Sequence, residues 1–185
     1  ELFGWDFDWM FQTHASAKLD LPTLELAKKA GCVSFSYGLE SASPAVLESM
    51  HKKIDPKDVA EAIQLAHKAN IGFSANLIFG DIAETSDTFT ESLTFWMNHT
   101  RDAFVFLGTV VPYPGSELFE SARKKGLFPD KKAYYEHIHE INVNITQMPD
   151  QEWFAKQAVL RYLEDAWAFP KTALTVMEPV KREDK

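Results

Sequence analysis

The strongest constraint on the fold is a regular alternation of strand-like and helix-like segments along the chain. Short runs rich in β-branched and aromatic residues alternate with stretches whose apolar residues recur every three or four positions, and Gly, Pro or Asp marks most of the joins. This alternation is typical of βαβ units, in which consecutive strands lie parallel and helices cover the sheet. We therefore expect an α/β fold.

The expected elements follow from this periodicity and from the residues at their ends. Strands are predicted at Trp9–Ala17, Cys32–Leu39, Gly72–Phe79 and Ala103–Val111, with an extra strand where His139, Ile141, Val143 and Ile145 alternate. Helices are predicted at 21–30, directly after 43–44, and at 56–69, 116–125 and 150–167. Another helix is predicted from the apolar stripe of Phe89, Leu93, Trp96 and Met97. Asp20 and Asp55 are candidate N-caps, each followed by a proline in the first turn.

Length and charge narrow the class of protein. The 185 residues suit one domain with a sizeable core, and the net charge of −8 gives no indication of nucleic acid or of an anionic membrane as a partner. No apolar stretch approaches 18 residues, so we expect a cytoplasmic protein. The chain begins at Glu1 within a pattern already in progress, which predicts a piece of a longer protein.

The predicted strands each divide into two faces, because side chains alternate in direction along a strand. The small, polar faces carry Gln12, His14 and Ser16 in the first strand, Ser34, Ser36, Gly38 and Glu40 in the second, and Ser74, Asn76, Ile78 and Gly80 in the third. The opposite faces are bulky and apolar, as with Val33, Phe35, Tyr37 and Leu39. We expect four consecutive strands to turn small hydrophilic side chains toward a shared ligand cavity. An open sheet with one face in water is the alternative.

Three motifs follow one another at regular intervals. They are AGCVSFSYGLES (30–41) with SPAVLESMHKK (43–53), AIQLAHKANIGFSANLIFGDIAET (62–85), and VPYPGSELFESARKKG (111–126). Together they resemble the later motifs of radical SAM enzymes and span roughly the first two thirds of the chain. The resemblance implies a partial, open (β/α) TIM-like barrel over residues 1–130, truncated at its N-terminal side. Residues 131–185 would form a C-terminal helical extension that packs on the barrel, with a frayed tail.

The resemblance also implies cofactors for the parent protein. In this family a CxxxCxxC loop binds a [4Fe-4S] cluster, and an electron from the cluster cleaves S-adenosylmethionine (SAM) to a 5′-deoxyadenosyl radical, as in oxidoreductases of the Fe-S type. That loop is absent from this sequence, in which Cys32 is the only cysteine. We therefore expect this chain alone to be inactive and to bind neither SAM nor the cluster, both of which belong to the parent.

Several residues match the part of the family that holds the nucleoside of SAM. The resemblance implies ribose contacts from Ser34, Ser36 and Glu40, and adenine contacts from Asn76, Ile78 and Gly80 on the next strand and from Val110, Val111 and Pro112 at the end of the fourth. His14 would meet the SAM carboxylate or a substrate, since histidine donates a hydrogen bond in either protonation state.

Each assignment has a simpler alternative. Glu40 would cap a helix or pair with a lysine, the two serines would only pack, the 112–115 segment would be a rigid turn, and His14 would be an ordinary interior histidine. Ile82 and Ala83 replace the Pro-Gly that precedes Glu84 in the family, so Glu84 is also interpreted as a helix-start carboxylate. Cys32 is predicted to be a small buried hydrophobe. His137 and His139 would share one strand face, at the surface rather than on a metal.

Two other functions fit the sequence. A conventional (β/α)-barrel enzyme would act through Glu40, Glu84 and His14, and a noncatalytic binding domain would keep only the form of a barrel. No catalytic residue is identified, and the substrate, whether a small molecule or a macromolecule, is not predicted. Because Trp9–Ala17 would lie at an unpaired edge, self-association is expected.

Overall fold

The structure is a computed structural model that describes residues 7–14, 19–99, 103–128, 131–136 and 142–168. The described strands form one parallel sheet in the order β1-β2-β3-β4. They are β1 (Trp9–Thr13), β2 (Cys32–Glu40), β3 (Gly72–Phe79) and β4 (Phe104–Thr109). The prediction of an α/β fold with four parallel strands is confirmed.

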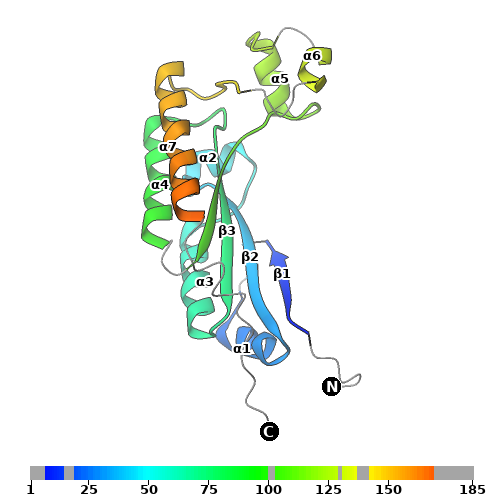
Figure 1. Ribbon diagram of the computed structural model, residues 1–185, viewed down its shortest axis with the longest axis vertical. Coiled ribbons are helices and arrows are strands. Elements are labelled where there is room, and N and C mark those ends of the chain that lie inside the picture. Colours follow the sequence, from blue (N-terminus) through cyan, green and yellow to red (C-terminus); the bar gives the residue numbers. More distant parts are fainter. Residues whose placement is uncertain (1–6, 15–18, 100–102, 129–130, 137–141, 169–185) are drawn as a thin grey trace.

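Helices connect the strands, and further helices follow β4 (Figure 1). The connecting helices are α1 (Leu21–Lys29), α2 (Pro44–Ser49), α3 (Pro56–Lys68) and α4 (Ser86–His99), and β4 is followed by α5 (Glu117–Lys124), α6 (Lys131–Glu136) and α7 (Asp150–Ala168). Both predicted N-caps are present, since Asp20 Oδ1 accepts the Thr23 N–H and Asp55 Oδ1 accepts the Lys57 N–H, each at 2.9 Å. Such caps satisfy N–H groups that the first turn leaves unpaired.

One face of the sheet is buried under helices. The bulky side chains predicted for this face, including Phe35, Tyr37, Leu39, Phe73 and Leu77, are nearly inaccessible. They share one core with residues of α1, α3, α4 and α7, among them Leu24, Ile63, Trp96, Trp153 and Leu160. Figure 1 shows α4 and α7 side by side along this part of the sheet. Helix α7 thus packs on the sheet, whereas the domain boundary at residue 130 stays a prediction.

The other face, which we call the open face, carries Gln12, Ser36, Asn76 and Phe106. Parallel pairing aligns Gln12 with Ser36, Ser36 with Ser74, and Asn76 with Phe106, so these side chains project from the same side. Where the predicted polar residues lie in described strands, they therefore share one surface, from which Met10 of β1 projects as well. The expectation of small hydrophilic side chains on all four strands is wrong for β4, because its alternation places Phe104 and Phe106 on the open face.

Smaller differences from the sequence prediction have local causes. The β1–β2 pairing shifts between Trp9 and Met10, so Cys32 takes the buried position predicted for Val33, which is half-buried. Strand β1 ends at Thr13 rather than Ala17, and residues 15–18 lie outside the described residues. The prediction of an extra strand is wrong for residues 142–145, which are irregular. The remainder of that predicted strand, including His139, lies outside the described residues.

Helices α5 and α6 form a small unit beyond the carboxyl ends of the strands (Figure 1). Phe119 and Ala122 of α5 and Tyr134 of α6 form a second cluster of buried residues together with Phe128 and Ile145. The Tyr134 hydroxyl donates a hydrogen bond to the carbonyl of Pro112, which ties this unit to the segment that leaves β4. Among the helices of the described ranges, none is long and apolar enough to cross a membrane.

The turn after β3 depends on Gly80. Its φ is +105°, and a Cβ placed there would lie 3.0 Å from two atoms of the Trp153 ring. Gly115 has a similar φ of +93°, but a Cβ there would have no neighbour within 4 Å. The two glycines thus share a backbone conformation unfavourable for L-residues and differ in the space around them.

We expect Gly80→Ala to lower the free energy of unfolding more than Gly115→Ala does. The backbone conformation should cost roughly 1–2 kcal/mol in both variants, and overpacking against Trp153 should add about 1–3 kcal/mol in Gly80→Ala alone. Urea unfolding followed by tryptophan fluorescence measures both values. If both variants lose the same free energy of unfolding, the Trp153 ring moves aside for the added methyl group without an energetic penalty.

Candidate functional site

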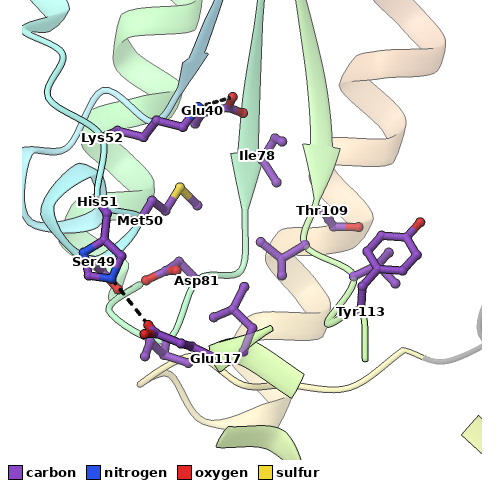
Figure 2. Close-up of a pocket in the computed structure, with 14 residues that line it drawn as sticks. Glu40, Ser49, Met50, His51, Lys52, Ile78, Asp81, Thr109, Tyr113 and Glu117 are labelled. Atoms are coloured by element: carbon purple, nitrogen blue, oxygen red, sulfur yellow. Dashed lines mark hydrogen bonds and ion pairs between the residues drawn. The ribbon is translucent and has the colours of Figure 1, made fainter. Parts of the chain in front are cut away.

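A cleft of about 580 Å³ lies at the carboxyl ends of β2, β3 and β4. Its walls come from the ends of these strands and the segments that follow them, from residues 49–52 at the end of α2, and from the start of α5. In Figure 2 the side chain of Ile78 lies between the Glu40–Lys52 pair on one side and Tyr113 on the other. Ligand sites of α/β proteins are usually found at this end of the sheet, because the loops that follow the strands converge there.

Glu40 is held in place from two sides. The Asn76 amide donates a hydrogen bond of 2.7 Å to Glu40 Oε2, and Lys52 Nζ donates one of 3.1 Å to Glu40 Oε1. The exposed fraction of the Glu40 side chain is 15%, which leaves its carboxylate within reach of a ligand. The alternative in which Glu40 pairs with a lysine is thus observed, and the pair stands inside the cleft.

The backbone at Glu40 is unusual and aims its side chain. The residue has a φ of +64°, and the Ser41 N–H bonds the Leu39 carbonyl at 2.8 Å, which closes a three-residue γ-turn. The β2–β3 register shifts at this point, from Tyr37 opposite Ala75 to Glu40 opposite Leu77. Such backbone strain persists where the surrounding structure enforces it, and it concentrates at functional sites.

Buried serines hold the loop that follows Glu40. Ser92 of α4 shares a 3.0 Å hydrogen bond with the Ser41 hydroxyl, and its Oγ accepts the Ala42 N–H at 3.1 Å. Ser41 Oγ in turn accepts the Ser43 N–H. Because Ser41, Ser43 and Ser92 are nearly inaccessible, these bonds form in a low-dielectric setting where they are hard to replace by water. The position of Glu40 is therefore coupled to α4.

The structure brings only some of the predicted site residues to the cleft. Glu40, Ile78, Val110 and Val111 line it, and Asn76 reaches it through Glu40. Ser34 and Ser36 lie nearer the amino end of β2, on the open face and away from the cleft. His14 is exposed beyond the end of β1, so it is neither part of this cleft nor an interior histidine.

Two predicted residues serve the framework. Pro112 is buried and its carbonyl accepts the Tyr134 hydroxyl, and Gly80 faces Trp153 instead of the cleft. Neither residue lines the cleft.

Sequence reasoning missed several residues of the cleft. Lys52 and Asp81 are the charged ones that bear most on its chemistry, and Met50 and Tyr113 add apolar surface. Asp81 directly follows Gly80 after a buried strand, which is a signal that could have marked it. Lys52 lies within the motif SPAVLESMHKK, but the motif does not indicate that it approaches Glu40, because this contact depends on how the loop after α2 folds back.

Glu84 is a buried carboxyl that organises the turn after β3. Its exposed fraction is 1%; Oε2 accepts the Gly80 N–H at 2.9 Å and Oε1 accepts the Thr88 hydroxyl at 3.0 Å. Burial raises the pKa of Glu84 from 4.5 to about 7, although these two hydrogen bonds act in the opposite direction. Glu84 precedes α4 and does not line the cleft, so the three residues of the conventional-enzyme hypothesis do not meet at one site.

The described residues offer no evident metal centre. No group of three or more His, Cys, Asp or Glu side chains in the described ranges could hold a metal ion. The Cys32 side chain is buried in the core, as predicted, and burial raises the pKa of its thiol. His137 and His139 lie outside the described residues.

The family comparison covers the central part of this site. Residues 11–95 match the sequence model of the radical SAM superfamily, a stretch that contains Glu40, Asn76 and Ile78. The resemblance noted in the motifs is thereby confirmed for this segment, whereas Val110, Val111 and Pro112 lie beyond it.

Curated relatives of the radical SAM segment are named as methyltransferases. An uncharacterized methyltransferase of Pyrococcus horikoshii is 29% identical over 119 residues, which are 64% of this chain and 26% of that protein. Bacteriochlorophyllide d C-12(1)-methyltransferase of Chlorobaculum tepidum is 31% identical over 102 residues, 55% of this chain and 22% of that protein. The chain thus spans about a quarter of the length of these relatives.

Solved radical SAM structures share the fold. Coproporphyrinogen III oxidase (HemN) of Escherichia coli, a radical SAM enzyme, superposes on 86% of this chain and 32% of that chain, with a TM-score of 0.55 and 12% identity. The radical S-adenosylmethionine methyltransferase TsrM of Kitasatospora setae, with cobalamin and a [4Fe-4S] cluster bound, covers 66% of this chain and 23% of its own, with a TM-score of 0.52 and 16% identity. At these identities the likeness extends to the fold alone.

The raised pKa of Glu84 predicts a pH-dependent stability. Because the folded pKa of about 7 lies above the ordinary 4.5, the stabilisation is complete below pH 4.5 and is lost as pH rises through about 7. Glu84→Gln should remove this loss, which amounts to about 3 kcal/mol at 1.4 kcal/mol per pKa unit. The free energy of unfolding, measured by urea titration from pH 4.5 to 8, tests this.

The exposed Glu91 of α4 provides a matched control, and Glu91→Gln should retain the pH profile of the unchanged protein. A Glu84→Gln profile that falls with pH as steeply as this control would contradict the expectation.

Proposed function

We propose that this chain forms the nucleoside-binding half of a SAM site in a radical SAM enzyme. The observation that carries the proposal is the Glu40 carboxylate, hydrogen-bonded by Asn76 and Lys52, beside apolar Ile78 and Val110 in one cleft. A nucleoside has a flat apolar base and two ribose hydroxyls, and this combination of an apolar wall and a fixed acceptor is complementary to both.

The cleft suits this ligand in size and charge. Its volume of about 580 Å³ is within the range of roughly 300–1,000 Å³ typical of small-molecule sites. Glu40 would accept hydrogen bonds from the ribose hydroxyls, and each such charge-assisted bond is stronger than one between neutral groups. Lys52 would balance the negative charge of a ligand carboxylate bound nearby. Ile78, Val110 and Val111 would pack against the base and exclude water.

The iron-sulfur cluster would be held elsewhere. The metal-binding side chains of the described residues do not gather, and the Cys32 side chain is in the core, so cluster ligands are proposed to lie outside these residues. When bound in the whole enzyme, SAM and the [4Fe-4S] cluster would supply the radical chemistry. The role proposed for this chain is to bind and orient the nucleoside and to keep water from it.

The reaction class proposed for the whole protein is methyl transfer. This inference rests on the names of both curated relatives, which favour a methyltransferase over an oxidoreductase of the Fe-S type. The relatives are matched over only about a quarter of their length, and their names do not specify a substrate for this protein.

The whole protein, purified without oxygen, should be brown and should consume SAM after reduction, as expected of a radical SAM enzyme. A colourless protein without SAM turnover would contradict the proposal.

The ribose contact can be tested on its own. We expect the whole protein to bind 5′-deoxyadenosine about tenfold more tightly than 2′,5′-dideoxyadenosine, because only the former offers both hydroxyls to the Glu40 carboxylate. Glu40→Gln should remove most of this preference. Isothermal titration calorimetry measures the four dissociation constants.

Glu48→Gln is the control for this experiment, since Glu48 is exposed on α2 near the same loop. If Glu40→Gln and Glu48→Gln discriminate between the two nucleosides equally well, Glu40 does not contact the ribose.

A further inference from the structure

We infer that the cleft contains a second subsite, at Asp81, for the primary ammonium group of an amine substrate. Asp81 lies in the turn after β3, lines the cleft and is only 2% exposed. Figure 2 shows the Met50 side chain between those of Asp81 and Glu40. The inference deepens the proposed function by naming a substrate class, and it rests on that function only in calling the bound amine a substrate.

One oxygen of the Asp81 carboxylate is left for a ligand. Oδ1 accepts the Ala83 N–H at 2.8 Å within the same turn, whereas Oδ2 has no hydrogen-bond partner in the described part of the chain. Among the described side chains, Trp153 Nε1 is the one fully buried polar atom without a partner. Asp81 Oδ2 therefore keeps access to solvent, and the cleft that Asp81 lines provides it. Because a carboxylate oxygen in so buried a residue is costly to leave unpaired, a ligand donor would stabilise it.

The charges of the cleft favour a cation as that donor. Its basic side chains are Lys52 and His51, and both already face other carboxylates. Lys52 Nζ lies 3.1 Å from Glu40 Oε1. His51 Nε2 lies 3.4 Å from Glu117 Oε2. Asp81 is thus the carboxylate of this cleft that has no basic partner within the described ranges, and a positively charged ligand group would supply one.

The narrow opening and the neighbouring side chains define the cation further. Since Asp81 is almost inaccessible, it admits only a small head group, and a primary ammonium is a compact cation with three N–H donors. Met50, Ile82 and Leu118 line the same cleft and offer apolar surface to the rest of the molecule. The subsite thus suits an amine with an apolar body.

Benzylamine, which is protonated at neutral pH, is the probe, and benzyl alcohol is its uncharged counterpart of similar size. The whole protein should bind benzylamine about tenfold more tightly, the scale of one charge-assisted hydrogen bond. Benzyltrimethylammonium keeps the charge without an N–H and should bind no better than the alcohol. Ligand-observed NMR titration measures the three dissociation constants. Equal affinities for benzylamine and benzyl alcohol, or tight binding of benzyltrimethylammonium, would overturn the inference.

Asp81→Asn removes the charge and keeps an oxygen that can accept the Ala83 N–H. It should abolish the preference for benzylamine. Glu48→Gln, which neutralises an exposed carboxylate outside the cleft, should retain that preference. Because Asp81→Asn removes a buried charge without a cation beside it, its urea midpoint should be no lower than that of the unchanged protein. A lower midpoint would show that the carboxylate serves the fold, and it would count against the inference, as would a retained preference.

A second titration separates this inference from the proposed function. Benzylamine is titrated with and without saturating 5′-deoxyadenosine, which should not weaken its binding if the two subsites are distinct. Competition would show that Asp81 belongs to the nucleoside site and would overturn the assignment to a substrate. Loss of the ribose preference while amine binding still depends on Asp81 would refute the proposed function alone, and the converse result would refute this inference alone.

Discussion

The hydrogen bond between Asn76 and Glu40 is the interaction on which the site depends. It joins the carboxyl end of β2 to β3 at the point where their register shifts, and it holds Glu40 in a conformation with φ of +64°. Lys52 balances the negative charge from the other side. A partly buried carboxylate with two donors stays an acceptor of fixed direction, which a flexible surface glutamate would not.

The framework behind this interaction is built from polar groups that the core protects. Ser92 of α4 fixes the loop after Glu40, and Glu84 fixes the turn after β3 through the Gly80 N–H. Trp153 of α7 then closes the space over Gly80. Because these contacts join α4 and α7 to the ends of two strands, the cleft depends on helices that are distant in sequence. Rigid elements that carry loops in this way are the usual means of positioning a binding site.

The family match and the geometry coincide on the same residues. Residues 11–95 match the sequence model of the radical SAM superfamily, and within them Glu40, Asn76 and Ile78 come together at the cleft. Beyond the match, the segment that follows β4 adds Val110 and Val111 to the cleft, and β4 itself places Phe104 and Phe106 on the open face. A shared fold accommodates many reactions, so the match does not by itself specify a substrate.

Features with local causes were predictable from the sequence alone. The caps at Asp20 and Asp55 and the two faces of β2 and β3 depend on neighbours a few residues away, and the periodicity of the side chains reports them. The resemblance to the family motifs likewise indicated Glu40, Asn76 and Ile78, since each motif is a short run of neighbouring residues. The face of β4 was misjudged because the same pattern of alternation fits either orientation until the strand is paired.

Tertiary structure decided which of these residues meet. Lys52 reaches Glu40 only because the loop after α2 folds back, Trp153 contacts Gly80 although the two are distant in sequence, and register alone sets Phe106 beside Asn76. The sequence alone determined which segments form helices and strands and which of their side chains share a face, since both follow from backbone geometry. The cleft itself required long-range packing, because proximity between distant residues depends on the register and docking of whole elements.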